Sequence, residues 1–294
     1  MANPRILEQA RIFIFENARL LERRRFEHIF QGGSKQAVIN TLRAYQNEDG
    51  GFGNALEPDI RCPQSQPVPT EMALMIMDAL AYWDRDMLTQ IIEYLRTVTL
   101  SDGGLPTTLR AGSDYPHAPW WFTDSPIQPS VNPTGRIIGL LYKQRVRSDF
   151  FEDQWFTKTV DYLWRVLEHE QPEGYHDGIQ WITFLQHTPE RERAQNVLPL
   201  IEAWLRRSGT IETNPEAVGY VQKVLDWAPT PQSYANPFIL PSDIQMHLDA
   251  LVKQQQADGG WPINWPPMST AVETEWRGLV TLERVSTLKA YGII

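Results

Sequence analysis

The chain has 294 residues and a formal net charge of −9, which argues against the basic surface that general nucleic-acid binders and anionic-membrane binders need. With 42% hydrophobic residues it can build a large core, while Cys62, the only cysteine, excludes an internal disulfide and a zinc site of four cysteines. Because no apolar run approaches the roughly 20 residues of a membrane span, we expect a cytoplasmic protein without membrane or nucleic-acid partners.

Helical periodicity dominates the first third of the chain. Apolar residues three and four apart predict a long first helix, which Gly32 and Gly33 would end. Ser34 is a typical N-cap for the helix that follows. The helices predicted in this part span residues 4–31, 34–46, 70–83 and 87–98.

The rest of the chain also reads as helix, and strand signals are nearly absent. Asn132-Pro133 is expected to open a helix, since proline suits the first helical turn. The further helices predicted span residues 132–142, 150–169, 177–186, 189–207, 215–227, 242–256 and 272–290. The sequence therefore predicts an all-α protein of eleven helices.

One glycine-bearing turn recurs between these helices. The segment Gln46–Gly53 (QNEDGGFG) returns as Gln255–Trp261 (QQADGGW), and Asp102–Pro106 (DGGLP) is a third copy. Glycine supplies positive φ for a tight reversal, aspartate accepts backbone N–H bonds, and the aromatic residue packs between hairpins. We therefore expect the aspartates of these turns to be structural. The full set of repeat turns is placed near residues 46–53, 99–106, 171–178, 208–214 and 255–265.

Repeated helical hairpins indicate how the chain is organised. Residues 70–83 and 272–290 suit an inner layer, and residues 86–99 and 242–256 suit an outer layer. Stacked hairpins must bury a continuous apolar face, and a ring achieves this without end caps. The sequence therefore predicts a single domain over residues 1–294, an α/α toroid of five to six hairpins.

The repeat resembles that of the prenyltransferase and squalene-cyclase family, in which this turn is followed by Pro and Thr before an Ala/Leu-rich helix. Pro69-Thr70 and Pro133-Thr134 fit that second half, and Thr274 is a looser match. The resemblance runs in outline from residue 34 to 290. It implies the toroid, with a small, largely apolar ligand of the isoprenoid type bound in a central cavity.

The catalytic motifs of that family are missing from the chain. Class II terpene cyclases, which the repeat resembles, carry Asp-x-Asp-Asp just before an inner helix. In this chain Glu273, just before Thr274, is the only carboxylate in that register. Protein prenyltransferases bind zinc through Asp-x-Cys, but Asp59 and Cys62 are three residues apart. Asp-Asp-x-x-Asp and a phosphate-binding glycine loop are also absent. We therefore expect no metal and no cofactor.

Three long loops, 53–69, 105–132 and 261–271, are expected to cover one side of the toroid's mouth, because loops of this length in a compact domain are usually functional. The catalytic candidates are Asp59, His117, Asp124 and Glu273. The ligand-binding candidates, from these loops and the short turn near residue 174, are Glu57, Tyr115, Trp120, Trp121, His176, Trp181, Trp261 and Trp265. The alternative interpretation is structural, with the tryptophans plugging an open end of the toroid.

Three functions remain open at this point. The first is an enzyme or binding protein for a small, largely apolar, isoprenoid-type molecule, with aromatic walls that can also stabilise cations. The second is a carbohydrate-active hydrolase or lyase, in which tryptophan stacks on a sugar and two carboxylates serve as acid and base. The third is a non-catalytic scaffold that binds a protein partner through the loop face.

Overall fold

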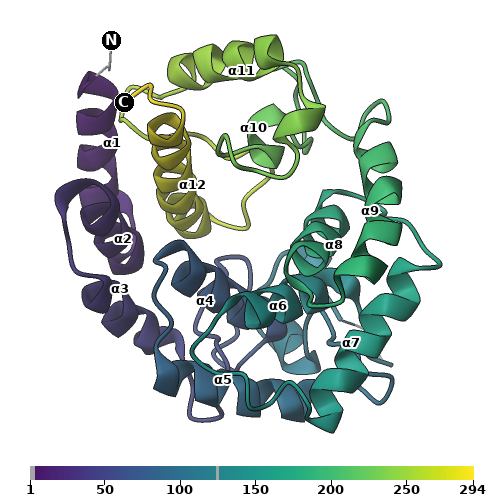
Figure 1. The fold of residues 1–294 in the computed structure, drawn as a ribbon. Coiled ribbons are helices and arrows are strands. Elements are labelled where there is room, and N and C mark those ends of the chain that lie inside the picture. The colour runs from purple at the N-terminus through teal and green to yellow at the C-terminus, as the bar shows by residue number, and fades with distance from the viewer. Residues whose placement is uncertain (1–3, 124–125) are drawn as a thin grey trace. The chain divides into compact units, whose positions relative to one another are not determined.

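A computed structural model describes residues 4–123 and 126–294, and this part of the chain is all-helical (Figure 1). It contains twelve α-helices and isolated β-bridges but no β-strand, so the predicted all-α class is confirmed for the described residues. The chain divides into two compact units: unit 1 comprises Met1–Thr41 and Leu205–Ile294, and unit 2 comprises Leu42–Trp204. Closure of the hairpins into one toroid stays a prediction.

Unit 2 contains a layer of three helices flanked by others (Figure 1). The layer consists of α4 (Pro67–Ala79), α6 (Val131–Lys143) and α8 (Tyr175–His187), with α6 packed against both neighbours. Against it lie α5 (Arg85–Val98), which contacts α4, and α7 (Gln154–Leu167), which contacts α6, while α9 (Arg191–Leu205) ends the unit. Trp164 of α7 meets Phe184 of α8 edge-on, with ring centroids 5.0 Å apart, so aromatic rings fill the space between the layers.

Local signals account for where the unit 2 helices begin. Pro67 and Pro69 occupy the first turn of α4, where a missing N–H costs nothing. The Asp84 carboxylate accepts the N–H of Met87 at 2.9 Å and so caps α5, and the Ser130 hydroxyl accepts the N–H of Asn132 at 3.2 Å to cap α6.

Unit 1 brings the two ends of the chain together (Figure 1). Its long helix α12 (Thr270–Ala290) packs against α1 (Pro4–Asn17) and α2 (Leu20–Gln31). A Cβ at Gly278 of α12 would lie 2.7 Å from the Ala18 Cβ, so the chain is very close to α12 at that point. The remaining elements of unit 1 are α3 (Lys35–Leu42), which ends at the boundary, α10 (Val224–Trp227), α11 (Pro241–Lys253) and the 3-10 helix Asn236–Phe238. Further 3-10 helices in unit 2 span Arg43–Tyr45, Arg110–Asp114 and Pro119–Trp121.

Two predicted helices of unit 1 are wrong in extent. The helix expected over residues 4–31 is broken, because Arg19 is extended (φ −61°, ψ 159°) and separates α1 from α2. The helix expected over residues 215–227 is reduced to α10, since Gly219 has a left-handed φ of +87° and Glu212 pairs with Lys223 in a β-bridge. Gly32 does end α2 as expected, with a left-handed φ of +71°.

The first copy of the repeated turn shows what the repeat does. The Asp49 carboxylate accepts the N–H of Gly51 at 3.0 Å, and Gly50 has a φ of +89°. The N–H of Phe52 donates to the Thr70 hydroxyl of α4 at 3.1 Å. The turn is therefore bonded to the first turns of the helix that follows it, and Asp49 is structural.

The other two copies have the same bonds. In each, the aspartate accepts the N–H of the second glycine, the first glycine has positive φ, and the next N–H donates to a threonine at 3.0 Å. The residues are Asp102, Gly103, Gly104, Leu105 and Thr134 in unit 2, and Asp258, Gly259, Gly260, Trp261 and Thr281 in unit 1. Thr281 thus fills the place for which the sequence suggested Thr274, and that assignment was wrong by two helical turns.

None of the helices in residues 4–123 and 126–294 combines the length and apolar character that crossing a membrane takes.

Candidate functional site

Two of the long loops lie against each other in unit 2. Ile60 forms an antiparallel bridge with His117, the N–H of Ala118 donates to the Asp59 carbonyl at 3.0 Å, and the N–H of Arg61 donates to the Pro116 carbonyl at 3.0 Å. The first two long loops are therefore paired through their backbones at residues 59–61 and 116–118. The third loop, 261–271, belongs to unit 1.

The carboxylates of the first loop are buried. Glu57 and Asp59 are 4% and 1% exposed. The indole N–H of Trp121 donates to Glu57 Oε1 at 3.1 Å, and the backbone N–H of Asp59 donates to Glu57 Oε2. Glu57 thus bonds the second loop to the first, so Glu57 and Trp121 have a structural role in the pairing of the two loops. Asp124, the proposed catalytic partner of Asp59, lies outside the described residues.

The middle of the second loop carries several exposed aromatic side chains and His117. His117 stacks on Phe122 with ring centroids 6.0 Å apart, and its Nδ1 lies 2.6 Å from the Tyr115 carbonyl oxygen. Tyr115, Trp120 and Phe122 are all exposed, Trp120 to 52%. Two predicted site residues, Tyr115 and His117, are therefore in contact, and Phe122 joins them unpredicted.

A second polar group lies on the helix layer of unit 2, where the sequence had suggested no acid. Glu71 of α4 is 4% exposed; its Oε1 lies 3.1 Å from Arg136 Nη1 of α6 and accepts from Gln180 Nε2 of α8 at 2.6 Å. Gln180 also donates to Asn132 Oδ1 at 3.1 Å. One carboxylate thus links all three inner helices. We refer to Glu71, Arg136 and Gln180 as the inner cluster.

Electrostatics make Glu71 unusual in this cluster. Burial raises the pKa of its carboxyl, while the Arg136 charge and the Gln180 hydrogen bond lower it only in part. A buried carboxyl group with raised pKa beside a cation is the arrangement from which proton-transfer groups are built. The structural alternative is a satisfied network that fixes the packing of α4, α6 and α8.

The surroundings of the inner cluster are partly open. Arg136 Nη1 also contacts the Met75 sulfur at 3.0 Å, and the Met75 side chain is exposed. His176, predicted from the sequence, lies close enough to Arg136 for that charge to act on it. Loss of hydration around the imidazole ring and the Arg136 charge lower the pKa of His176. Part of the residue is nevertheless exposed to solvent.

The sequence contained a signal for the inner cluster. Glu71 directly follows Thr70 and is the only ionisable residue in the first three turns of an otherwise apolar α4. Glu71 lies after the threonine of the repeat, whereas the acid of the terpene-cyclase motif precedes the inner helix. Arg136 and Gln180 carry no local signal, because only the packing of α6 and α8 against α4 brings them to Glu71.

A polar pocket of about 590 Å³ lies in unit 2 among the amino ends of α6 and α8 and the carboxyl end of α7. Trp181 and Tyr162 line it. Trp181 is only 2% exposed, and its indole N–H has no acceptor among the described residues. Burial and the neighbouring carboxylates raise the pKa of Tyr162 to about 12. The carboxylates that line the pocket are Asp102, Glu170, Glu173 and Asp177.

The unit 1 candidates lie in an aromatic setting. Trp261 is 1% exposed and donates its indole N–H to the Leu251 carbonyl at 2.9 Å, so it packs in the core and is not open to a ligand. Trp265 meets Trp276 edge-on with centroids 5.0 Å apart. Glu273 lies in the first turn of α12, where a carboxylate suits the helix dipole.

Within residues 4–123 and 126–294, no cluster of three or more His, Cys, Asp or Glu is placed to hold a metal ion. Cys62 is buried, and burial raises the pKa of its thiol, with the Sγ 3.0 Å from Gln64 Oε1. A buried thiol with raised pKa is a poor nucleophile.

Comparison with known proteins identifies no family. No family model and no curated protein matches the chain. Among solved structures, the crystal structure of a protein from Actinoplanes is similar at 15% identity, over 96% of this chain and 89% of that chain, with a TM-score of 0.48. A likeness at that level carries no argument about activity.

Proposed function

We propose that this protein binds a small, largely apolar ligand of the isoprenoid type against the inner helices of unit 2, and that the inner cluster acts on it. The observation that carries the proposal is the Glu71 carboxyl, buried with raised pKa and held between Arg136 and Gln180 beside the exposed Met75 side chain. The resemblance of the repeat to prenyltransferases and squalene cyclases supports the ligand class, and we place the activity in the cytoplasm.

The chemistry proposed for the cluster is proton transfer. A carboxylate whose proton affinity is increased by burial is suited to accept a proton from a substrate carbon or hydroxyl at neutral pH. Arg136 is partly exposed, and it contacts both Glu71 and Met75 through Nη1. The N–H groups of its other nitrogens can therefore donate to an oxygen of the ligand. Met75 supplies a soft apolar contact for the body of the ligand.

Native mass spectrometry of protein purified from its own host tests the proposal. The wild-type protein is expected to carry an adduct of constant mass that organic solvent extracts. Arg136→Met, which removes the ligand's donor, should lose the adduct. Arg207→Met, at an exposed arginine of unit 1, is the matched control and should retain it. An adduct that persists in Arg136→Met, or none in the wild type, would refute binding at this cluster.

A carbohydrate-active function is the second candidate, favoured by the polar pocket of unit 2. Its four carboxylates and the free indole N–H of Trp181 suit a ligand rich in hydroxyl groups better than an apolar one. We take Glu170 and Asp177, whose Oδ2 accepts the N–H of Glu173 at 3.2 Å, as the acid and base to test. If Asp177→Asn and Glu170→Gln both leave glycan cleavage unchanged, this candidate is excluded.

A further inference from the structure

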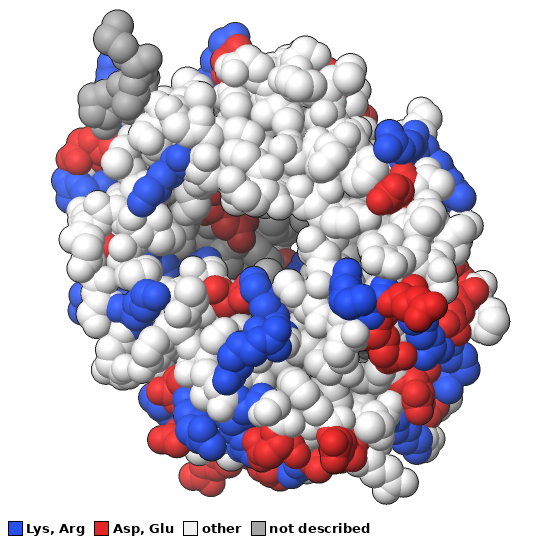
Figure 2. Space-filling model, viewed as in Figure 1, with Lys and Arg blue, Asp and Glu red and all other residues white. Residues whose placement is uncertain are grey.

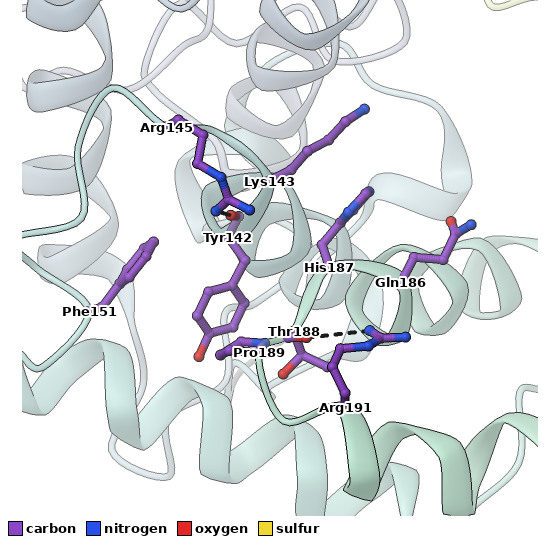
Figure 3. A pocket seen from close by; sticks show the side chains of 9 residues that line it. All are labelled: Tyr142, Lys143, Arg145, Phe151, Gln186, His187, Thr188, Pro189 and Arg191. Carbon is purple, nitrogen blue, oxygen red and sulfur yellow. Dashed lines mark hydrogen bonds between the residues drawn. The ribbon is translucent and has the colours of Figure 1, made fainter.

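A second pocket lies at the other end of the same helices in unit 2 (Figure 3). It measures about 360 Å³ and is formed where α6 and α8 end, with the start of α9 closing one side. Figure 3 shows the lining side chains, with Arg145 beside Tyr142 and Arg191 beside Thr188. The volume is in the range of small-molecule sites.

The pocket is positively charged although the protein is acidic. Lys143, Arg145 and Arg191 line it together with His187, and none of the lining residues is a carboxylate. Burial and the charges of Lys143, Arg191 and Arg145 lower the pKa of His187, with Asp78 acting in the opposite sense. The cations therefore act jointly on one place, which is the condition for attracting an anion.

Two of these cations have no carboxylate to neutralise them. Lys143 is paired with Asp78 at 2.7 Å. In the described part of the chain, by contrast, Arg145 and Arg191 form no ion pair, whereas arginines elsewhere, such as Arg193 with Glu168 at 2.6 Å, do.

Backbone carbonyls hold both guanidinium groups in place. Arg145 Nη1 donates to the Tyr142 carbonyl at 2.9 Å, and Arg191 Nη1 donates to the Leu185 carbonyl at 2.6 Å. A guanidinium has five N–H donors, so most remain for a ligand. Carbonyl contacts at helix ends explain why a cation is favoured at each position. They do not explain why both groups face one cavity without a carboxylate.

The pocket also has an aromatic wall. The Tyr142 and Phe151 rings lie 5.2 Å apart, and both line the cavity. A bare inorganic ion would leave this wall unused, whereas a small organic molecule with one charged end would cover it. We propose that this pocket binds a small organic oxyanion, a phosphate ester or carboxylate carried on an apolar or aromatic body, and that Arg145 and Arg191 recognise the oxyanion.

Isothermal titration calorimetry at low salt with phenyl phosphate, benzoate, inorganic phosphate and neutral benzyl alcohol tests this proposal. Phenyl phosphate or benzoate is expected to bind, and whichever is tighter identifies the oxyanion. Benzyl alcohol should not bind, and inorganic phosphate should bind more weakly than phenyl phosphate. No binding of either organic anion, equal binding of benzyl alcohol, or inorganic phosphate as tight as phenyl phosphate would overturn the proposal.

Variants place the binding in the pocket. Arg145→Gln/Arg191→Gln should weaken the affinity at least about tenfold, since charge-assisted hydrogen bonds are lost. Arg207→Gln, an exposed arginine of unit 1, is the control for net charge and should have no effect. If the double variant fails to fold, Lys143→Gln, which leaves both carbonyl bonds intact, should still weaken the affinity about threefold. Unchanged affinity in the folded pocket variants, or an equal loss in Arg207→Gln, would overturn the assignment.

Discussion

The repeated turn has the same backbone in both units and packs equally closely against a helix, but the side chains bonded to it differ. At Gly50 in unit 2 and at Gly259 in unit 1, a Cβ would come within 2.1 and 2.2 Å of a carbonyl oxygen of a neighbouring helix. The partners of the aspartate differ between the units. Asp49 accepts a hydrogen bond from the Ser65 hydroxyl, whereas Asp258 forms an ion pair with Arg277 at 2.8 Å. The comparison teaches that the repeat specifies a scaffold and leaves its side-chain chemistry free.

The helices that follow these turns extend the contrast. In unit 2, α4 carries Glu71 into a polar cluster, whereas in unit 1, α12 carries Trp276 against Trp265. Charged side chains are dense over α5 and α7 of unit 2 and sparse over α11 of unit 1 in Figure 2. These contacts place the three-helix polar network in unit 2 and an aromatic pair in unit 1, although the protein around Glu283 of α12 also raises the pKa of that carboxyl group.

The shared scaffold is tested by adding one carbon to the turn. Gly50→Ala and Gly259→Ala should each lower the free energy of unfolding by about 3 kcal/mol or more, because left-handed strain adds to a clash with backbone. Gly209→Ala is the control: its φ is +86° but no atom lies within 4 Å of the added carbon, so it should cost about 1 kcal/mol. Chemical denaturation measures all three, and losses equal to that of the control would show that the turns are not packed as described.

The polar cluster of unit 2 predicts a large effect of its own. Arg136→Met leaves the buried Glu71 carboxylate without its cation and should lower the free energy of unfolding by about 3 kcal/mol. Arg136→Met combined with Glu71→Leu should recover most of that loss, since no buried charge is then left. A double-mutant cycle measures this coupling, and simple additivity would mean that the pair does not interact.

The corrected register of unit 1 predicts a smaller effect. Thr281→Val removes the acceptor of the Trp261 N–H and should cost about 1–2 kcal/mol. Thr274→Val removes only a hydroxyl that donates to the Thr270 carbonyl near the helix start and should cost less than about 0.5 kcal/mol. If thermal unfolding ranks the two in the opposite order, Thr274 is the threonine of the repeat after all.

The smallest effect expected is a pH dependence that belongs to unit 2. Burial raises the pKa of Glu71 in the folded protein above its ordinary 4.5, so the folded state binds the proton first as pH falls. The stability of wild type relative to Glu71→Gln should therefore rise as pH is lowered through the folded pKa and level off below the ordinary value. Denaturation at several pH values measures the difference, and a fall over that range would contradict the assigned shift.

Most helices could be predicted from the sequence because their periodicity and end residues are local. The break at Arg19 and the loss of helix near Gly219 could not, since they depend on how α12 and the chain around Lys223 pack. The site was predicted less well. Loop residues such as Glu57 and Trp121 were found by composition and are indeed bonded to each other, whereas Glu71 needed Arg136 and Gln180 from two other helices to become recognisable.

The most direct test of the account is a crystal structure of the protein with the ligand that it retains from its own host. The account expects electron density for that ligand beside Arg136 and Met75 on the inner helices of unit 2. Density beside Trp265 and Trp276 in unit 1, with the inner cluster unoccupied, would contradict it.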